Sequence, residues 1–328
     1  MGLGYRQAQS DPCTWIYTED NQVISIISGH VDDFLFVGHD NCPIWARLRQ
    51  AIQQKFRWQE WERDTFTQCG VRVCRRSDGT FELSQEQYLE GVTEIQVPRE
   101  RRRQKHEPTS DWEKSSLRAL LGALSWHVGQ VGYKYSAHVS LYLSEVPNST
   151  VETIDHVNKL LHKVKQDAKD PMLIHPFLPD DRLQLVAWVD ASSQNRPDGY
   201  STKGIFVGMS TGALMAGEVA KVSPVYWQSG RIDRVCRSPG SAEARAAVDA
   251  EDIFFLLRFE WSEFSGFVPN KHEPDQHVAK TPGALVTDSR NVYDRVLKPY
   301  ITPKGAQRKV DIEMLALKEA QNHNGLVV

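Results

Sequence analysis

The sequence predicts an α+β protein, a mixed α/β fold with more than one hydrophobic core. Its 328 residues are 40% hydrophobic and 25% charged, which is the composition of a globular protein, and the length suggests two domains. The first third alternates apolar and polar residues as strands do, and the middle shows helical periodicity. The last third alternates strands with long helices, a pattern typical of a mixed sheet covered by helices.

The charge balance limits how this chain could contact nucleic acid. The net charge is −3, so such contacts would depend on local basic patches and metal-bound phosphates rather than on a polycationic surface. Five cysteines without a Cys-x-x-Cys pair indicate a reducing compartment, with no disulfide framework and no zinc ribbon. The N-terminus has no apolar signal core, and no apolar run is long enough to span a bilayer. We therefore expect an intracellular protein, in the cytoplasm or the nucleus, with no membrane partner.

The front third begins with a strand, a tight turn and a second strand over residues 23–38, with Asp32 and Asp33 at the turn. Apolar residues flank the turn on both sides, and we expect them to bury this hairpin. Three further elements follow: a helix over 43–56 that starts with a proline, a hairpin over 66–83 with Ser-Asp-Gly at its turn, and a helix over 84–92.

A basic run separates the front third from the helical middle. Five basic residues lie between the prolines at 98 and 108, where a solvated linker is as well supported as a phosphate contact. Helical periodicity then covers 115–128, 136–144 and 150–168, and a segment rich in Pro and Asp at 169–182 marks a boundary. The last third predicts strands at 183–189, 201–209, 222–228 and 284–287, and helices at 241–264, 289–297 and 311–321.

Asp32 and Asp33 are the first candidates for metal ligands. Nucleotidyl transfer uses two divalent cations that bridge the attacking and leaving oxygens, and Mg²⁺ prefers carboxylate oxygens. An Asp-Asp pair alone is weak evidence, because the chain contains a second pair, Asp180-Asp181, in a plain loop. Only the first pair lies between apolar strands, which favours a functional role for it.

Asp190, Glu243 and Asp288 form a second set. Asp190 and Asp288 each end a predicted strand, and Glu243 lies in the first turn of a predicted helix. Carboxylates at such places can meet at one sheet edge, which is the arrangement that a two-metal hydrolase needs to hold Mg²⁺ and orient an attacking water. Each residue alone fits a cap or turn role better. As an ordered set on matching elements, they favour a metal site.

Several motifs resemble those of the Pol polyprotein of Ty1/copia retrotransposons, and they occur in the same order. HVDDFLFVG at 30–38 resembles the Tyr-Val-Asp-Asp box of the reverse transcriptase, with His30 in place of the usual Tyr. LGYRQAQSDPCTWIY before it and CGVRVCRRSDGTFELSQEQYLEGV after it resemble the segments that flank the box. The helical middle departs from the pattern, because Gln-Val-Gly-Tyr at 130–133 replaces Thr-Arg-Pro-Asp.

The rear third resembles the RNase H domain of the same polyprotein. Tyr-Ser-Thr-Lys-Gly at 200–204 and Tyr-Trp-Gln-Ser-Gly-Arg at 226–231 are similar to two of its strand motifs. Ser-Ala-Glu-Ala-Arg around Glu243 is similar to its helix start, and Asp288-Ser289 stands where the family has Asp-Asn. Asp311 matches the Asp of a His-Ile-Asp-Ile motif.

The resemblance implies three segments. They are a partial reverse-transcriptase palm with the start of the thumb over 1–108, a helical thumb or connection over 109–180, and an RNase H-like domain over 181–328 that lacks its last strand and helix. It also implies Mg²⁺ or Mn²⁺, held by the catalytic carboxylates Asp32 and Asp33 in front and Asp190, Glu243 and Asp288 in the rear. Asp311 is a further candidate ligand, in place of the missing fourth carboxylate of the family.

The implied partners are an RNA–DNA hybrid, an RNA template with its DNA primer, and other Pol segments, namely integrase and the missing palm and fingers. Because the palm strand with the third polymerase Asp is expected upstream of Met1, we expect no polymerase activity from this chain alone. Cleavage of the RNA strand of a hybrid is the first hypothesis. The alternatives are a catalytically decayed retroelement remnant that binds nucleic acid without cutting it, and a host protein that kept only the fold.

Overall fold

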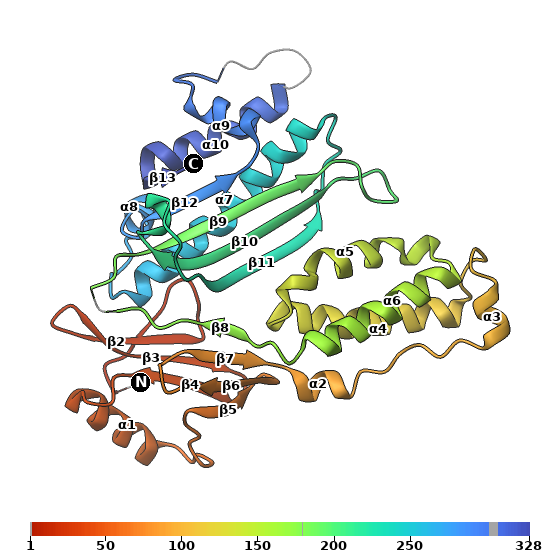
Figure 1. The fold of residues 1–328 in the computed structure, drawn as a ribbon. Helices are drawn as coiled ribbons and strands as arrows, with labels where there is room; N and C mark the ends of the chain where they lie inside the picture. Colours follow the sequence, from red (N-terminus) through yellow and green to blue (C-terminus); the bar gives the residue numbers. More distant parts are fainter. Residues whose placement is uncertain (1, 179, 302–307) are drawn as a thin grey trace.

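The computed structural model describes residues 2–178, 180–301 and 308–328. Within these ranges the chain forms three separate β-sheets and a group of helices, which confirms the mixed α/β fold class (Figure 1). Among the described helices, not one combines the length and the apolarity that crossing a bilayer requires.

The front sheet is antiparallel and has the strand order β1-β2-β3-β4. Its strands are β1 (Arg6–Gln7), β2 (Thr14–Glu19), β3 (Gln22–His30) and β4 (Asp33–Gly38). Helix α1 (Pro43–Lys55) begins with the predicted proline and buries Trp45, Leu48 and Ile52 in the core that it shares with this sheet. The predicted strand, turn and strand are β3 and β4.

A second antiparallel sheet, in the order β5-β6-β7-β8, joins distant parts of the chain. Its strands are β5 (Thr65–Gln68), β6 (Val71–Arg75), β7 (Phe81–Ser84) and β8 (Met172–Ile174). The hairpin predicted over 66–83 is β6 and β7, but its first residues belong to a further strand, β5, which pairs with β6. Gly79 in the turn between β6 and β7 has a φ of +86°, which glycine adopts at no steric cost. The boundary predicted at 169–182 contains β8, because pairing of Met172 with Leu83 imposes an extended backbone there.

The middle of the chain is helical, as predicted, and has its own core. Its helices are α2 (Glu86–Glu90), α3 (Arg99–Arg103), α4 (Asp111–Gln130), α5 (Ser136–Glu145) and α6 (Val151–Asp167). Leu117, Leu121 and Leu124 of α4 pack with Ile154 and Leu161 of α6, and all five are almost fully buried. Helix α4 begins four residues before the predicted start, because Ser110 and Glu113 form a capping box at its N-terminus.

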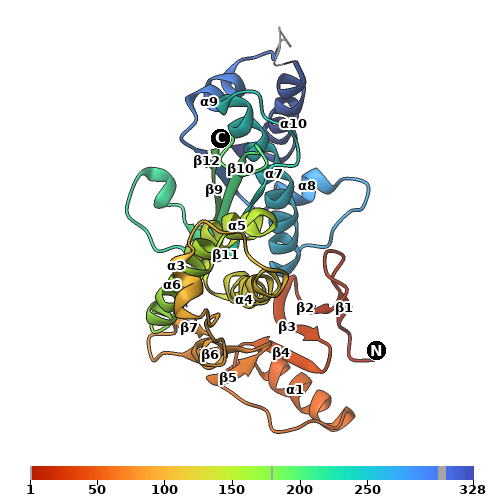
Figure 2. The same ribbon diagram turned by 90° about the vertical axis from the view of Figure 1, so that its right-hand side faces the viewer.

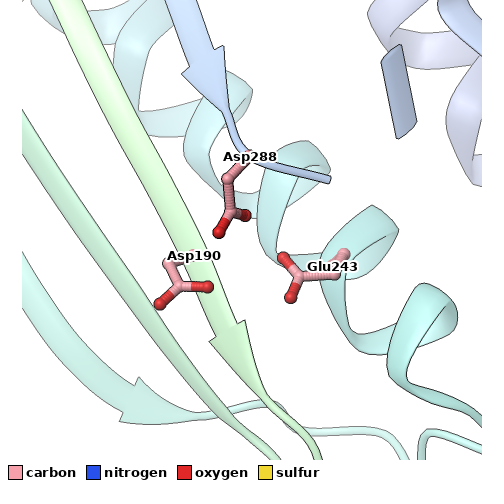
Figure 3. Close-up of side chains that lie close together, drawn as sticks. All are labelled: Asp190, Glu243 and Asp288. Atoms are coloured by element: carbon pink, nitrogen blue, oxygen red, sulfur yellow. The ribbon is translucent and has the colours of Figure 1, made fainter. Parts of the chain in front are cut away.

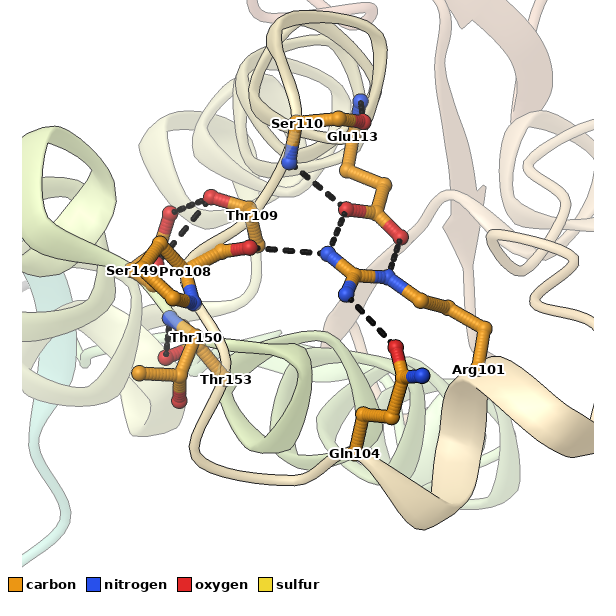
Figure 4. Close-up of polar contacts among 9 residues, drawn as sticks. All are labelled: Arg101, Gln104, Pro108, Thr109, Ser110, Glu113, Ser149, Thr150 and Thr153. Atoms are coloured by element: carbon orange, nitrogen blue, oxygen red, sulfur yellow. Dashed lines mark hydrogen bonds and ion pairs between the residues drawn. The ribbon is translucent and has the colours of Figure 1, made fainter.

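Part of the basic run between 98 and 108 is structural (Figure 4). Arg101 donates two hydrogen bonds of 2.9 Å to the two carboxylate oxygens of Glu113, and a third of 2.7 Å to the carbonyl of Pro108. Arg101 therefore fixes α3 to the start of α4 and does not face an external phosphate. Arg99, Arg102 and Arg103 remain exposed.

The rear sheet has the order β11-β10-β9-β12-β13. Its strands are β9 (Leu183–Ser192), β10 (Thr202–Thr211), β11 (Ser223–Arg231), β12 (Gly283–Thr287) and β13 (Leu326–Val327). The helices around it are α7 (Pro239–Phe264), α8 (Pro274–Val278), α9 (Arg290–Leu297) and α10 (Arg308–Asn324). β9, β10 and β11 are antiparallel, whereas β12 runs parallel to β9. The predicted strands and helices occur in the predicted order, and α8 and the short β13 are elements that the sequence did not predict.

Helix α7 and strand β9 together supply a large part of the rear core. Ala242, Ala246 and Ala247 are fully buried, and these small side chains let the helix lie close to Ala187 and Val189 of the strand. On the other side, α5 of the helical part packs against β11 (Figure 1 and Figure 2). The indole N–H of Trp227 on β11 donates to the carbonyl of Val128 on α4 at 2.6 Å.

The N-terminal segment is attached to the far end of α7 through Glu263. This carboxylate is fully buried and accepts hydrogen bonds from the Arg6 guanidinium at 2.8 Å and from the Ser10 hydroxyl at 2.7 Å. The backbone N–H groups of Gln9 and Ser10 donate to it as well, at 3.0 and 2.9 Å. The front and rear parts of the chain therefore share a buried, charged network.

Candidate active site

Asp190, Glu243 and Asp288 meet at one end of the rear sheet (Figure 3). Each offers a carboxylate oxygen, and these oxygens all lie within 4.8 Å of one another. In the described part of the chain, they form the one group of three or more His, Cys, Asp or Glu side chains close enough to share an ion. The ordered set predicted from the sequence is therefore a spatial cluster, which is called the carboxylate cluster below.

Strand register places two of the three residues. β9 and β12 are parallel neighbours, and Thr287 pairs with Val189. Asp288 follows Thr287 and Asp190 follows Val189, so both aspartates lie at the same end of the sheet. Parallel strands are spaced about 4.8 Å apart, which keeps the two carboxylates within reach of a single ion.

Glu243 comes from α7, but from a different turn than predicted. The helix begins at Pro239 after the cap residue Ser238, so Glu243 is its fifth residue and no acidic residue lies in the first turn. The reason is local, because the Ser238 side chain accepts from the backbone N–H of Ser241 and a proline suits the first helical position. The buried Ala242 and Ala244 on either side hold this turn close to the strand.

The cluster concentrates negative charge. Burial, and then the nearby Asp190 and Asp288, raise the pKa of Glu243 from 4.5 to about 7, against a smaller opposing effect of the Ala191 backbone N–H. The same N–H group donates to Asp190 Oδ1 at 2.8 Å. Among the described residues, no Lys or Arg forms an ion pair with any of the three carboxylates.

This donor set fits a divalent cation. Three carboxylates whose oxygens lie close enough to share one ion are hard oxygen ligands of the kind that Mg²⁺ and Mn²⁺ prefer. Burial and the two neighbouring carboxylates disfavour the charged form of Glu243, and a bound cation would offset this repulsion. Sequence reasoning missed the Ala191 N–H, since a backbone donor leaves no signal in residue identity.

Asp32 and Asp33 lie at the turn between β3 and β4, where Val31 has a φ of +57°. Both are exposed, and the described residues do not bring a third ligand side chain to them. The expectation that apolar neighbours bury this hairpin is wrong, because Phe34 and Leu35 are each 37% exposed and Val37 is 53% exposed. The cause is that β4 is the outer strand of its sheet and pairs with β3 alone.

Asp311 is not part of the carboxylate cluster. It lies in the first turn of α10, is buried, and its Oδ1 is 3.0 Å from a guanidinium nitrogen of Arg295 on α9. The Asp311 carboxylate thus forms an ion pair with Arg295 of the neighbouring helix. The other aspartate pair, Asp180-Asp181, lies in a loop as expected, and Asp181 accepts a hydrogen bond from the backbone N–H of Leu178 at 2.7 Å.

Comparisons with known proteins give remote likenesses only. No protein-family model matches the sequence, and no curated protein matches it. A structure of the foamy viral protease-reverse transcriptase dRH in complex with ds DNA is similar, with 11% sequence identity and a TM-score of 0.47 over 89% of this chain and 44% of that chain. A structure of the foamy viral protease-reverse transcriptase in complex with dsDNA is similar at 10% identity and a TM-score of 0.46, over 89% of this chain and 52% of that chain.

The chain therefore spans about half the length of the two proteins. Likenesses this remote assign no chemistry, and the relationship to Ty1/copia elements stays a prediction from the sequence motifs. The chemistry proposed below rests on the carboxylates of this chain.

Proposed function

We propose that the rear part of this chain is a metal-dependent nuclease of the RNase H type, which cleaves the RNA strand of an RNA–DNA hybrid. One observation carries the proposal: carboxylate oxygens from β9, from the second turn of α7 and from the residue after β12 lie within 4.8 Å of one another. A phosphodiester hydrolase that uses two metals needs such a group. The sequence motifs around the three residues support the choice of substrate.

Asp190, Glu243 and Asp288 would hold Mg²⁺ or Mn²⁺ through their oxygens. When bound, the cations supply an activated water and stabilise the charge that develops on the phosphate oxygens. The chain contributes the positions of the ligands, because two of them are fixed by β-sheet register and the third by a capped helix. Glu243 must release its proton before it can bind a cation, since its pKa in the metal-free protein is about 7.

The front hairpin belongs to a second, incomplete proposal. Asp32 and Asp33 would take part in DNA synthesis on an RNA template and a DNA primer only together with other Pol segments, which would supply the rest of the palm and the fingers. We propose no polymerase activity for this chain alone. We also propose that it works inside the cell, in the cytoplasm or the nucleus, alongside integrase from the same polyprotein.

The test is a cleavage assay on a hybrid that carries a labelled RNA strand, with Mg²⁺ present. We expect cleavage by the unmutated chain and a loss of at least about 100-fold in Asp190→Asn, because the change removes one ligand charge. Asp180→Asn is the matched control, since it makes the same replacement in an exposed loop, and it should cleave normally. Binding without cleavage by the unmutated chain would contradict the proposal and support the decayed remnant.

A further inference from the structure

A groove of about 530 Å³ lies between α4, α5 and β11. Its helical wall consists largely of small residues, among them Ser125, Gly129, Ser140 and Ser144. Its sheet wall includes Trp227, Ser229 and Arg231, and the loop between β9 and β10 adds Arg196 and Asp198. The groove is open, its lining mixes polar groups with apolar side chains such as Val139, Leu143 and Trp227, and two of the residues that line it are arginines.

Arg196 is the unusual residue of this groove, because it is charged and only 8% exposed. Its Nε donates to the Thr202 hydroxyl at 3.0 Å, and its terminal nitrogens donate to the Ser140 hydroxyl at 2.7 Å and to the Ser140 carbonyl at 3.5 Å. All three acceptors are neutral. A guanidinium has five N–H groups, so these bonds leave part of its donor capacity unused.

No carboxylate of the described chain forms an ion pair with Arg196. The nearest acidic neighbour along the chain, Asp198, is exposed and pairs with Arg231 at 3.2 Å. Burial lowers the pKa of Arg196, and the charge of Arg231 lowers it further, against the opposing charge of Asp198. A buried charge without a counter-charge is unfavourable, and such a group is expected where a ligand of opposite sign completes the site.

The groove lies on the same side of the rear sheet as Asp190. Asp190 pairs with Gly204, and Gly204 pairs with Ser229, which lines the groove. Residues directly opposite each other on neighbouring strands point to the same face of a sheet. Ser229 is two strands from Asp190, a spacing of roughly 10 Å. One nucleic acid could therefore occupy both places.

We propose that this groove is a second phosphate-binding site, which takes a backbone phosphate of the nucleic acid held at the carboxylate cluster, with the Arg196 guanidinium as its main ligand. The identity of the nucleic acid rests on the proposed function, whereas the anion site rests on Arg196 and the groove. A guanidinium matches a phosphate in geometry and charge, and serine hydroxyls are common additional donors to phosphate oxygens.

Gly129 allows a test that leaves Arg196 and its partners in place. A side chain added there meets nothing within 4 Å, so Gly129→Glu and Gly129→Gln should both fold, and they differ only by a charge in the groove. Gly122 on the same helix is equally open but does not line the groove, so Gly122→Glu controls for added charge on α4. Arg196→Met removes the proposed ligand, and Arg47→Met is its exposed control on α1.

The measurement is the affinity for a labelled RNA–DNA hybrid in EDTA, at several salt concentrations, where no cleavage occurs. We expect Arg196→Met to bind about 10-fold more weakly and with a salt slope smaller by about one. Gly129→Glu should bind more weakly than Gly129→Gln by a similar factor, while Gly122→Glu and Arg47→Met should match the unmutated chain. Equal affinities for Gly129→Glu and Gly129→Gln would overturn the proposal.

Two further outcomes separate the sources of phosphate and the two proposals. If inorganic phosphate stabilises the unmutated chain but not Arg196→Met, and the hybrid affinities of the two are equal, the site takes free phosphate and the backbone proposal is wrong. If the charge at position 129 changes hybrid affinity but no variant cleaves, the groove proposal stands and the nuclease proposal fails. If the chain cleaves the hybrid but the charge at position 129 does not change hybrid affinity, the nuclease proposal stands and the groove proposal fails.

Discussion

Glu243 is the residue at which the charge of the carboxylate cluster becomes measurable. Its pKa of about 7, raised by burial and by Asp190 and Asp288, means that the metal-free folded chain keeps a proton that the unfolded chain releases near 4.5. Between these two values the folded state binds more protons. The free energy of unfolding therefore falls as the pH rises from about 4.5 to about 7.

We predict that this loss of stability is smaller in Glu243→Gln. One proton sets a ceiling of about 1.4 kcal/mol per pH unit for the slope, and solvent contact of the carboxylate reduces it. Urea unfolding in EDTA at pH 5, 6, 7 and 8 measures the slope in both proteins. Glu251 on the same helix also has a pKa of about 7, and it contributes equally to both, so the difference isolates Glu243.

We predict that Mg²⁺ opposes the loss of stability that the metal-free chain shows as the pH rises. The cation replaces the proton on the cluster, so added Mg²⁺ should raise the unfolding midpoint of the unmutated chain at pH 8 more than at pH 5. Glu243→Gln should show a smaller gain. The idea is wrong if Mg²⁺ stabilises both proteins equally, since the ion would then bind elsewhere.

The site residues were predictable to different degrees. Asp190 and Asp288 could be selected from their positions at the ends of apolar runs, and the parallel pairing of β9 with β12 brings them close together. Asp311 could not be assigned in this way, because its partner Arg295 lies on another helix and only tertiary packing brings the two together. Arg196 gave no signal, since a basic residue beside a Pro-Asp-Gly turn looks like a solvated loop residue until its burial is known.

At the scale of elements, the start of α4 shows how side chains fix a helix boundary. The Glu113 carboxylate accepts hydrogen bonds from two guanidinium nitrogens of Arg101 and from the backbone N–H of Ser110 (Figure 4). The hydrogen bonds from Arg101 lower the pKa of Glu113 from 4.5 to about 2, because their effect is larger than the opposing effect of burial. One carboxylate thus caps a long helix and attaches the preceding short one.

We predict that Glu113→Gln lowers the free energy of unfolding by about 1–3 kcal/mol at pH 7, because charged hydrogen bonds are replaced by neutral ones. The folded pKa lies below the ordinary value, so this contribution is complete above 4.5 and disappears as the pH falls towards 2. Urea unfolding at pH 7 and pH 3 would show it. An equal difference between the two proteins at both pH values would contradict the assignment to charge.

Helices and hairpins were more predictable from the sequence than helix boundaries and the pairing of strands that are distant in the chain. The periodicity that predicted 150–168 agrees with α6 within a residue at each end. The capping box at Ser110 and Glu113 was readable but lay before the apolar run that defined the predicted helix. β8 could not be predicted, since three residues in a Pro- and Asp-rich segment become a strand only through pairing with β7, far away in the chain.

At the scale of the whole molecule, Glu263 connects the front sheet to the rear sheet. Although burial raises the pKa of this carboxyl, hydrogen bonds from Ser10, Arg6 and Gln9 outweigh it and lower the pKa below its ordinary value. The carboxylate is therefore ionised and fully buried among donors. Removing its charge leaves several of them poorly paired.

We predict that Glu263→Gln destabilises the chain by about 2–5 kcal/mol, the range for breaking a buried charged network. Amide hydrogen exchange should accelerate at Gln9 and Ser10, whose N–H groups donate to Glu263. Glu260→Gln is the matched control on the same helix, because burial, Asp11 and Glu263 raise the pKa of Glu260 and make its charge dispensable. Faster exchange that spreads evenly over the chain, with no excess at the N-terminal segment, would argue against a local attachment.

Helix α7 carries Glu243 near one end and Glu263 near the other, twenty residues apart. An α-helix rises about 1.5 Å per residue, so the two positions are roughly 30 Å apart along a rigid rod. This rod is a spacer of constant length between the carboxylate cluster and the N-terminal segment that leads into the sheet bearing Asp32 and Asp33. If the proposed nuclease function holds, a duplex that contacts both the carboxylate cluster and the front sheet would be cut at a constant distance from the front sheet.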